Sequence, residues 1–124
     1  MPPTYHGRRF RSLSNSANGE VGAATIFHYT QRETIVSATY AGGSILTGTL
    51  LAIMAPDGAL DMRYQHVNTH GELMTGTCRS TLEILPDGRY RLHESWQWTC
   101  GDRTEGTSVV EEIPDPDDLA TRLM

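Results

Sequence analysis

The chain contains no lysine, and its ten basic residues are all arginine. Without lysine there is no Schiff-base nucleophile, no attachment point for pyridoxal phosphate and no Walker-type phosphate loop. Cysteine is also scarce. Cys78 and Cys100 are too few for a disulfide framework and match no zinc-ligand spacing, so we expect two reduced thiols.

Long apolar runs and excess positive charge are missing too. No run of about 18 apolar residues is present, which excludes a membrane-spanning helix as the expected fold. The start, Met1-Pro2-Pro3-Thr4, has no basic region followed by an apolar segment, so no signal peptide is predicted and a cytoplasmic location is expected. A net charge of -5 disfavours nucleic acid and anionic membranes as partners.

Helical periodicity is weak along the chain, apart from the short tail 117–124. Turn-forming dipeptides instead recur at short intervals and separate runs rich in Val, Ile, Thr, Tyr and Trp, the composition typical of strands. Asp-Gly and Gly-Gly favour the primed turns of hairpins, because those turns need positive φ. The turn signals are Gln31-Arg32, Gly42-Gly43, Asp57-Gly58, His70-Gly71, Asp87-Gly88 and Gly101-Asp102.

These signals predict an all-β chain of about eight strands. Consecutive hairpins without a long crossover favour an antiparallel up-and-down meander, and closure into a small barrel removes the exposed edges. A chain of 124 residues is one domain, with residues 1–4 and 114–124 expected as flexible tails. The predicted strands are 5–13, 24–30, 33–40, 44–54, 59–69, 72–85, 89–99 and 103–113.

Alternation within two strands predicts which side chains point into the barrel. The apolar face carries Tyr64 and His66 in one strand, and Glu94, Trp96 and Trp98 in the other. If Asp57-Gly58, His70-Gly71 and Asp87-Gly88 are two-residue turns, pairing across the hairpins adds Thr49, Thr77 and Arg79 to the same interior. This register needs a bulge near Ser80-Thr81 to return Leu82 and Ile84 to the core. In the last strand, Ser108, Val110 and Glu112 face inward in one alternative, and Val109, Glu111 and Ile113 in the other.

The predicted interior is therefore partly polar, which is costly without partners, trapped water or a ligand. Arg79 is expected either to pair with Glu94 or to bind an anionic ligand group. His66 is either a hydrogen-bonded core residue or a general base, and the two tryptophans either fill the barrel or form its ligand walls. The candidate ligand-binding residues are Tyr64, His66, Arg79, Glu94, Trp96, Trp98, Thr49 and Thr77.

Neither a metal nor a cofactor is predicted. His66 is the one histidine with a firm inward assignment, and a metal site needs several converging ligands. The glycines at Gly42-Gly43, Gly76 and Gly101 precede no predicted helix, so they do not form a phosphate-binding loop.

Three stretches carry a family resemblance: residues 5–11, residues 60–68 and residues 92–98, together with the ending at 106–112. They resemble a family of short, uncharacterised bacterial proteins, some of which are labelled N-acetylglutamate synthase. An acetyl-CoA-dependent acetyltransferase needs a mixed α/β core and a pyrophosphate-binding turn before a helix, and neither is predicted here. The overall shape is similar to lipocalin-like and calycin barrels, and fold likeness alone does not assign a function.

Three functions remain open from the sequence. The first is a barrel that binds a small anionic or carbonyl-bearing molecule in its interior. The second is an isomerase- or cyclase-type enzyme, in which Tyr64, His66 and Glu94 move protons and Arg79 holds an anionic group. The third is a structural or interaction protein with a filled, self-satisfied core. A homodimer is compatible with each of them.

Overall fold

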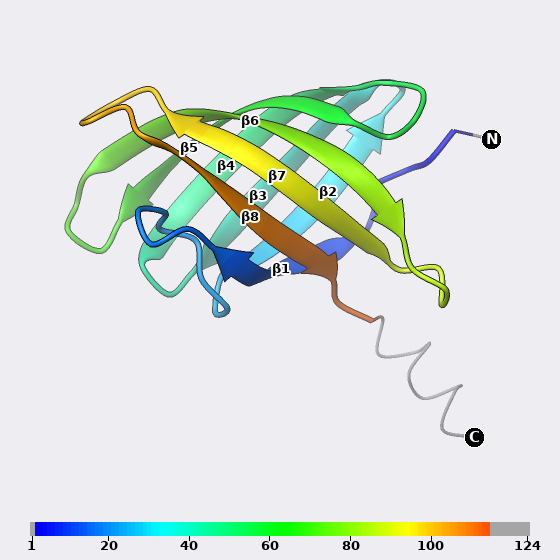
Figure 1. Ribbon diagram of the computed structural model, residues 1–124, viewed down its shortest axis with the longest axis horizontal. Helices are drawn as coiled ribbons and strands as arrows, with labels where there is room; N and C mark the ends of the chain where they lie inside the picture. The colour runs from blue at the N-terminus through cyan, green and yellow to red at the C-terminus, as the bar shows by residue number, and fades with distance from the viewer. Residues whose placement is uncertain (1, 115–124) are drawn as a thin grey trace.

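Each strand of this chain pairs with its neighbours in sequence, and the first strand closes on the last (Figure 1). The computed structural model describes residues 2–114, and most of the predicted tails, including residues 117–124, lie outside this range. The eight antiparallel strands form a closed up-and-down barrel, as predicted. They are β1 (Arg9–Asn15), β2 (Ile26–Arg32), β3 (Ile35–Gly42), β4 (Ile45–Met54), β5 (Leu60–Asn68), β6 (Leu73–Ile84), β7 (Tyr90–Trp98) and β8 (Glu105–Glu112).

Side-chain alternation creates the barrel's interior. In β5 and β7, every second residue is buried, or partly buried where it lines the interior, and the residues between them are mostly exposed. The sequence Tyr90-Arg91-Leu92-His93 shows the pattern, with Tyr90 and Leu92 inside. The inward placement predicted for Tyr64, His66, Glu94, Trp96 and Trp98 is confirmed.

The predicted two-residue turns are wrong, and the structure has three-residue loops at all three positions. At the first, Gly58 N donates to Ala55 O and Ala55 N donates to Ala59 O, both at 2.9 Å. Gly58 has φ of +90°, which places it as the left-handed residue that ends a type I turn. The loops ending at Gly71 and Gly88 have the same hydrogen-bond pattern.

One extra loop residue shifts the pairing by one and turns β4 and β6 over. His66 pairs with Met74 instead of Thr75, and Gly76 pairs with Trp98 in place of Thr77. Thr49, Thr77 and Arg79 consequently lie on the outer face. The inward residues of β6 become Gly76, Cys78, Ser80 and Leu82.

Two further sequence questions are settled by the same register. Leu82 packs against the core without the bulge predicted near Ser80-Thr81, since β6 pairs continuously with both neighbours. In β8, Ser108 and Val110 are buried, which selects the first of the two alternatives for that strand. Among the described residues, no helix is long and apolar enough to cross a membrane.

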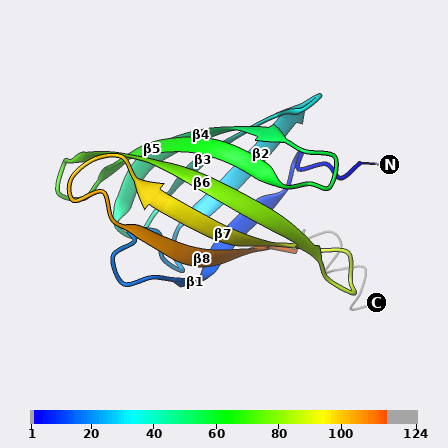
Figure 2. The same ribbon diagram turned by 45° about the horizontal axis from the view of Figure 1, so that its top comes forward.

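The two ends of the barrel differ. The N-terminal segment reaches one end, and the loop 16–25 and the β7–β8 hairpin lie at the other (Figures 1 and 2). Tyr5 is fully buried at the first end, where its hydroxyl donates to Gly58 O. Its ring contacts the rings of Phe10, Tyr29 and Tyr90. This aromatic plug fills the first end, so space for a ligand must lie toward the second.

Candidate functional site

A cavity of about 50 Å³ lies inside the barrel toward the end that carries the 16–25 loop. This volume has room for about four water-sized groups. Two tryptophans, Trp96 and Trp98, form part of its wall, with ring centroids 5.5 Å apart. The remaining lining residues are Asn15, Val21, Phe27, Tyr40, Leu50, Met62, Tyr64, His66, Cys78, Glu94 and Ser108.

Three glycines on alternate strands make room for aromatic rings beside this cavity. Each glycine lies directly opposite an aromatic residue of the neighbouring strand, and the pairs are Gly48 with Tyr40, Gly76 with Tyr64 and Gly106 with Trp96. A Cβ atom at Gly48 would lie 2.5 Å from the Tyr40 ring, and one at Gly106 would lie 2.4 Å from the Trp96 ring. The rings therefore lie against the glycine backbone along the barrel wall. If these rings pointed into the lumen instead, they would fill the space that this arrangement leaves open.

A row of polar residues crosses four neighbouring strands at the level of the cavity: Ser80 on β6, Glu94 on β7, Ser108 on β8 and Asn15 on β1. Directly opposed residues in antiparallel strands point to the same face, so the whole row faces the lumen. Asn15 is satisfied, because its Oδ1 accepts from Trp96 Nε1 at 3.0 Å and its Nδ2 donates to Val21 O at 3.0 Å. The Ser80 hydroxyl is buried and has no hydrogen-bond partner in the described part of the chain.

Glu94 is the acidic member of this row. Ser108 Oγ donates to Glu94 Oε1 at 2.9 Å, and no other residue within 2–114 hydrogen-bonds the carboxyl. Glu94 keeps some accessible surface because it lines the cavity, but protein surrounds its carboxyl. Burial, opposed by the weaker effect of the Ser108 hydrogen bond, raises the pKa of Glu94 from 4.5 to about 7. Near neutral pH the carboxyl can therefore either donate or accept a hydrogen bond.

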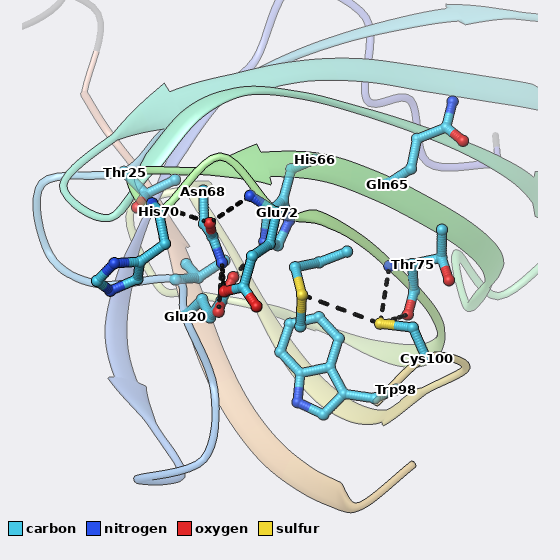
Figure 3. Close-up of polar contacts among 12 residues, drawn as sticks. Glu20, Thr25, Gln65, His66, Asn68, His70, Glu72, Thr75, Trp98 and Cys100 are labelled. Atoms are coloured by element: carbon cyan, nitrogen blue, oxygen red, sulfur yellow. Dashed lines mark hydrogen bonds and ion pairs between the residues drawn. The ribbon is translucent and has the colours of Figure 1, made fainter. Parts of the chain in front are cut away.

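His66 is held from both sides at the mouth of the cavity, and Figure 3 shows it beside Glu20. Its Nδ1 lies 2.9 Å from the Tyr40 hydroxyl, and its Nε2 lies 2.8 Å from Oε1 of Glu20 in the 16–25 loop. The Tyr64 ring stacks on His66 with centroids 6.4 Å apart. No hydrogen bond joins these two side chains among the described residues. With both ring nitrogens engaged, His66 is a positioned core histidine at the mouth.

The two sulfhydryl groups are free, as expected. Cys78 faces the cavity, and burial raises the pKa of its thiol far above the usual range. A thiol in that state is protonated at neutral pH and is a poor nucleophile. Among the described residues, no group of three or more His, Cys, Asp or Glu side chains could hold a metal ion.

The structure brings together five of the eight predicted site residues: Tyr64, His66, Glu94, Trp96 and Trp98. The predicted inward placement of Thr49, Thr77 and Arg79 is wrong, because their strands are turned over. The expected Arg79–Glu94 pair is therefore not formed, since the two side chains lie on opposite faces of the sheet. Sequence reasoning missed Asn15, Glu20 and Tyr40 at the site. Tyr40 could have been found from the alternation Val36, Ala38, Tyr40, whereas Asn15 and Glu20 fall in a segment that reads as a polar loop.

The new position of Arg79 leads to a testable prediction. Because Arg79 is exposed on the outer face of β6, Arg79→Ala should change the free energy of unfolding by no more than about 0.5 kcal/mol. Urea titration of the wild type and the variant measures the difference. A substantially larger loss of stability would contradict the prediction.

A protein-family model described as "Avidin-like protein" matches residues 3–113, nearly the whole described chain. No curated protein and no solved structure matches the sequence. The label N-acetylglutamate synthase receives no support from this result.

Proposed function

Because the chain belongs to the avidin-like protein family, we propose that its barrel binds one small molecule in the interior cavity, with Glu94 as the polar anchor. The observation that carries this proposal is the Glu94 carboxyl. It lines the cavity, it has a single hydrogen-bond partner within the described residues, and its pKa is raised to about 7. A buried group held in that state at neutral pH is typical of binding and catalytic sites.

The ligand chemistry follows from the charges inside the barrel. Arg79 lies on the outer face. Among the described residues, Glu94 lines the cavity and Glu20 lies at its mouth beside His66, so the charges there are mainly acidic. The expectation of an anionic or carbonyl-bearing ligand rested on Arg79 and His66 as polar anchors, and of these only His66 lies at the cavity among the described residues. A ligand that donates N–H hydrogen bonds would satisfy Glu94, which lines the cavity, and a flat apolar body would pack on the tryptophans.

Cyclic ureas and related compounds have this combination of features. Members of the avidin-like family bind small ligands such as biotin, whose cyclic urea offers two N–H donors. The bare ring of 2-imidazolidinone presents both N–H donors with the least bulk, whereas a ligand with a side chain needs the mouth to open further. Biotin and 2-imidazolidinone are therefore suitable probes of the cavity.

The proposal is tested by titrating the protein with 2-imidazolidinone, biotin, guanidinium and acetate. Both tryptophans of the chain line the cavity, so the tryptophan fluorescence, excited where tyrosine does not absorb, reports on this site. We expect the N–H donors to change the fluorescence and raise the Tm, and acetate to do neither. At a ligand concentration of 100 times Kd, the stabilisation should be about 2.7 kcal/mol.

Glu94→Gln should abolish these effects, since the amide cannot replace a carboxylate acceptor for two N–H groups. Glu105→Gln is the matched control, because Glu105 is exposed on β8 and points away from the lumen. If both variants bind a probe equally well, Glu94 is not the anchor. If no N–H donor binds and acetate does, the proposed ligand class is wrong.

A second candidate function is proton transfer in the same cavity. The observation in its favour is the pKa of Glu94, which suits a general acid or base near neutral pH. Of its other proposed residues, Arg79 lies outside the lumen, and His66 is engaged by Tyr40 and Glu20. A structural protein with a filled core and every polar group paired fits less well. Within the described residues, the Ser80 hydroxyl has no hydrogen-bond partner and the Glu94 carboxyl has one.

A further inference from the structure

We propose that the 16–25 loop is the gate of the cavity and that the Glu20 carboxylate is its latch. The loop joins β1 to β2, and Glu20 extends from it to the rim of the barrel (Figure 3). Oε1 of Glu20 lies 2.8 Å from His66 Nε2, and Oε2 accepts from Asn68 Nδ2 at 3.1 Å. The role of the gate in ligand uptake rests on the proposed function, whereas the latch itself does not.

The partners of Glu20 form a rigid receptor for it. His66 and Asn68 are 2% and 1% exposed and project from the same face of β5. Asn68 is fixed further, because its Oδ1 accepts from His70 N and Glu72 N, both at 3.0 Å. A carboxylate can only accept hydrogen bonds, so His66 Nε2 and Asn68 Nδ2 donate to it. Charge-assisted bonds to preorganised donors are the stronger kind, and two of them hold one side chain of the loop.

The residues next to the latch form part of the cavity wall. Val21 follows Glu20 in the chain and lines the cavity. Its carbonyl accepts from Asn15 Nδ2 at 3.0 Å, and the Asn18 carbonyl accepts from Trp98 Nε1 at 3.1 Å. Displacement of the loop would therefore remove one wall and expose the tryptophans.

The pairing between neighbouring strands of the described barrel is shortest where this loop lies. The seam between β1 and β2 contains three residue pairs, Arg9 with His28, Phe10 with Phe27 and Arg11 with Ile26. By contrast, β2 pairs with β3 over the whole range from Ile26 to Arg32. Beyond the short seam, β1 continues along β8 as far as Asn15, which pairs with Ser108. The loop thus lies where β1 extends beyond the start of β2 and has β8 as its paired neighbour.

The composition of the loop suits a moving segment. Gly19 and Gly22 flank the Glu20-Val21 pair, and Ala17, Asn18 and Ala23 are exposed. A Cβ atom at Gly22 would meet nothing within 4 Å. Segments with few buried apolar contacts open at low free-energy cost. Bonds from Asn18 to Glu105 O and from Thr25 Oγ1 to Gly42 O also hold the loop, so the latch acts together with them.

The chain offers a matched control for the latch. On the outer face, Glu83 Oε1 lies 2.8 Å from His93 Nε2, which repeats the Glu20–His66 contact at the same distance. Both Glu83 and His93 are about half exposed there, at 47% and 49%. Glu20→Ala and Glu83→Ala therefore remove the same kind of bond, and only the first lies on the loop.

The test is amide hydrogen exchange combined with acrylamide quenching of tryptophan fluorescence in the full chain. Loss of a hydrogen bond to a charged group should raise exchange of residues 16–25 by about tenfold in Glu20→Ala, with the core strands unchanged. Quenching should rise in parallel, because both tryptophans lie behind the loop. Glu83→Ala should change neither, and Glu20→Gln, which keeps one acceptor oxygen and loses the charge, should restore only part of the protection.

Each outcome decides the proposal. Equal exchange of residues 16–25 in Glu20→Ala and Glu83→Ala would show that Glu20 is no latch. Faster exchange without more quenching would show that the loop moves but does not gate the cavity. The on- and off-rates of 2-imidazolidinone should both rise in Glu20→Ala with little change in Kd. If no probe binds the wild type, the proposed function fails, and exchange and quenching still decide on the latch.

Discussion

Gly76→Ala is expected to lower the free energy of unfolding by about 1–3 kcal/mol and to close the cavity. A Cβ atom at Gly76 would lie 2.3 Å from the Tyr64 ring and its hydroxyl, and 2.8 Å from the carbonyl oxygen of Gln97. The backbone oxygen is fixed by strand pairing, so the Tyr64 ring must move. The lumen offers open space beside it, and a ring there occupies the volume proposed for the ligand.

Urea unfolding and the probe-induced shift in Tm measure the two effects. Gly22→Ala is the control, because Gly22 has open space around its Cα and no positive φ. There the substitution should stabilise the protein by about 0.4–1 kcal/mol through the unfolded chain. A double-mutant cycle with Tyr64→Leu isolates the contact, since the shorter side chain should recover part of the loss. A Gly76→Ala protein with wild-type stability and binding would show that the glycine does not shape the cavity.

The sequence predicted the architecture well because strand pattern and turn spacing are local properties. Each predicted strand overlaps an observed one, and the ends of β5 and β7 differ from the prediction by one residue. The clean alternation around Tyr64 and Trp96 also identified half of the lumen. A closed barrel was the expected solution for a meander with no free edges, whereas the pairing of β1 with β8 that closes it was left open by the sequence.

The register failed at the loops, where one residue decides the facing of a whole strand. The sequence did contain a signal. Proline precedes Asp-Gly in two of the three loops, at Pro56 and Pro86. Proline suits the second position of a type I turn, in which the glycine then takes the left-handed conformation. Read that way, Pro86-Asp87-Gly88 is a three-residue loop and Arg79 moves to the outer face, and Pro56-Asp57-Gly58 does the same for Thr49.

The remaining site residues depend on contacts between distant parts of the chain. Asn15 and Ser108 meet only because β1 pairs with β8. Glu20 reaches His66 across a separation of 46 residues, and no periodicity in the 16–25 loop indicates where its side chains point. Local patterns cannot predict such contacts before the closed barrel is known.

Glu94→Gln is expected to raise stability above that of the wild type at pH 8 and to lose this advantage toward pH 5. The pKa of Glu94 is 4.5 in the unfolded reference and about 7 in the folded protein. Between these values the folded state holds a proton that the unfolded chain has released, so rising pH favours unfolding. The stabilisation is complete below about pH 4.5 and is lost as pH rises through 7. A shift of this size corresponds to about 3 kcal/mol.

The difference between the two proteins isolates this effect. Other carboxyls act in the opposite direction, since hydrogen bonds from arginine lower the pKa of Asp61 and Glu111 and favour the folded state at higher pH. Urea unfolding of the wild type, Glu94→Gln and Glu105→Gln at pH 5, 6, 7 and 8 gives the required comparison. Glu105→Gln should run parallel to the wild type. A constant difference between Glu94→Gln and the wild type would show that Glu94 titrates normally.

The expected result also bears on function. An amide at position 94 can still accept the bond from Ser108 without a charge to desolvate. A carboxyl that weakens the fold at neutral pH is therefore hard to explain by stability alone. Buried groups of this kind are typical of sites where binding depends on them. If Glu94→Gln is both more stable at pH 8 and unable to bind 2-imidazolidinone, the same carboxyl accounts for the cost to the fold and for the recognition of the ligand.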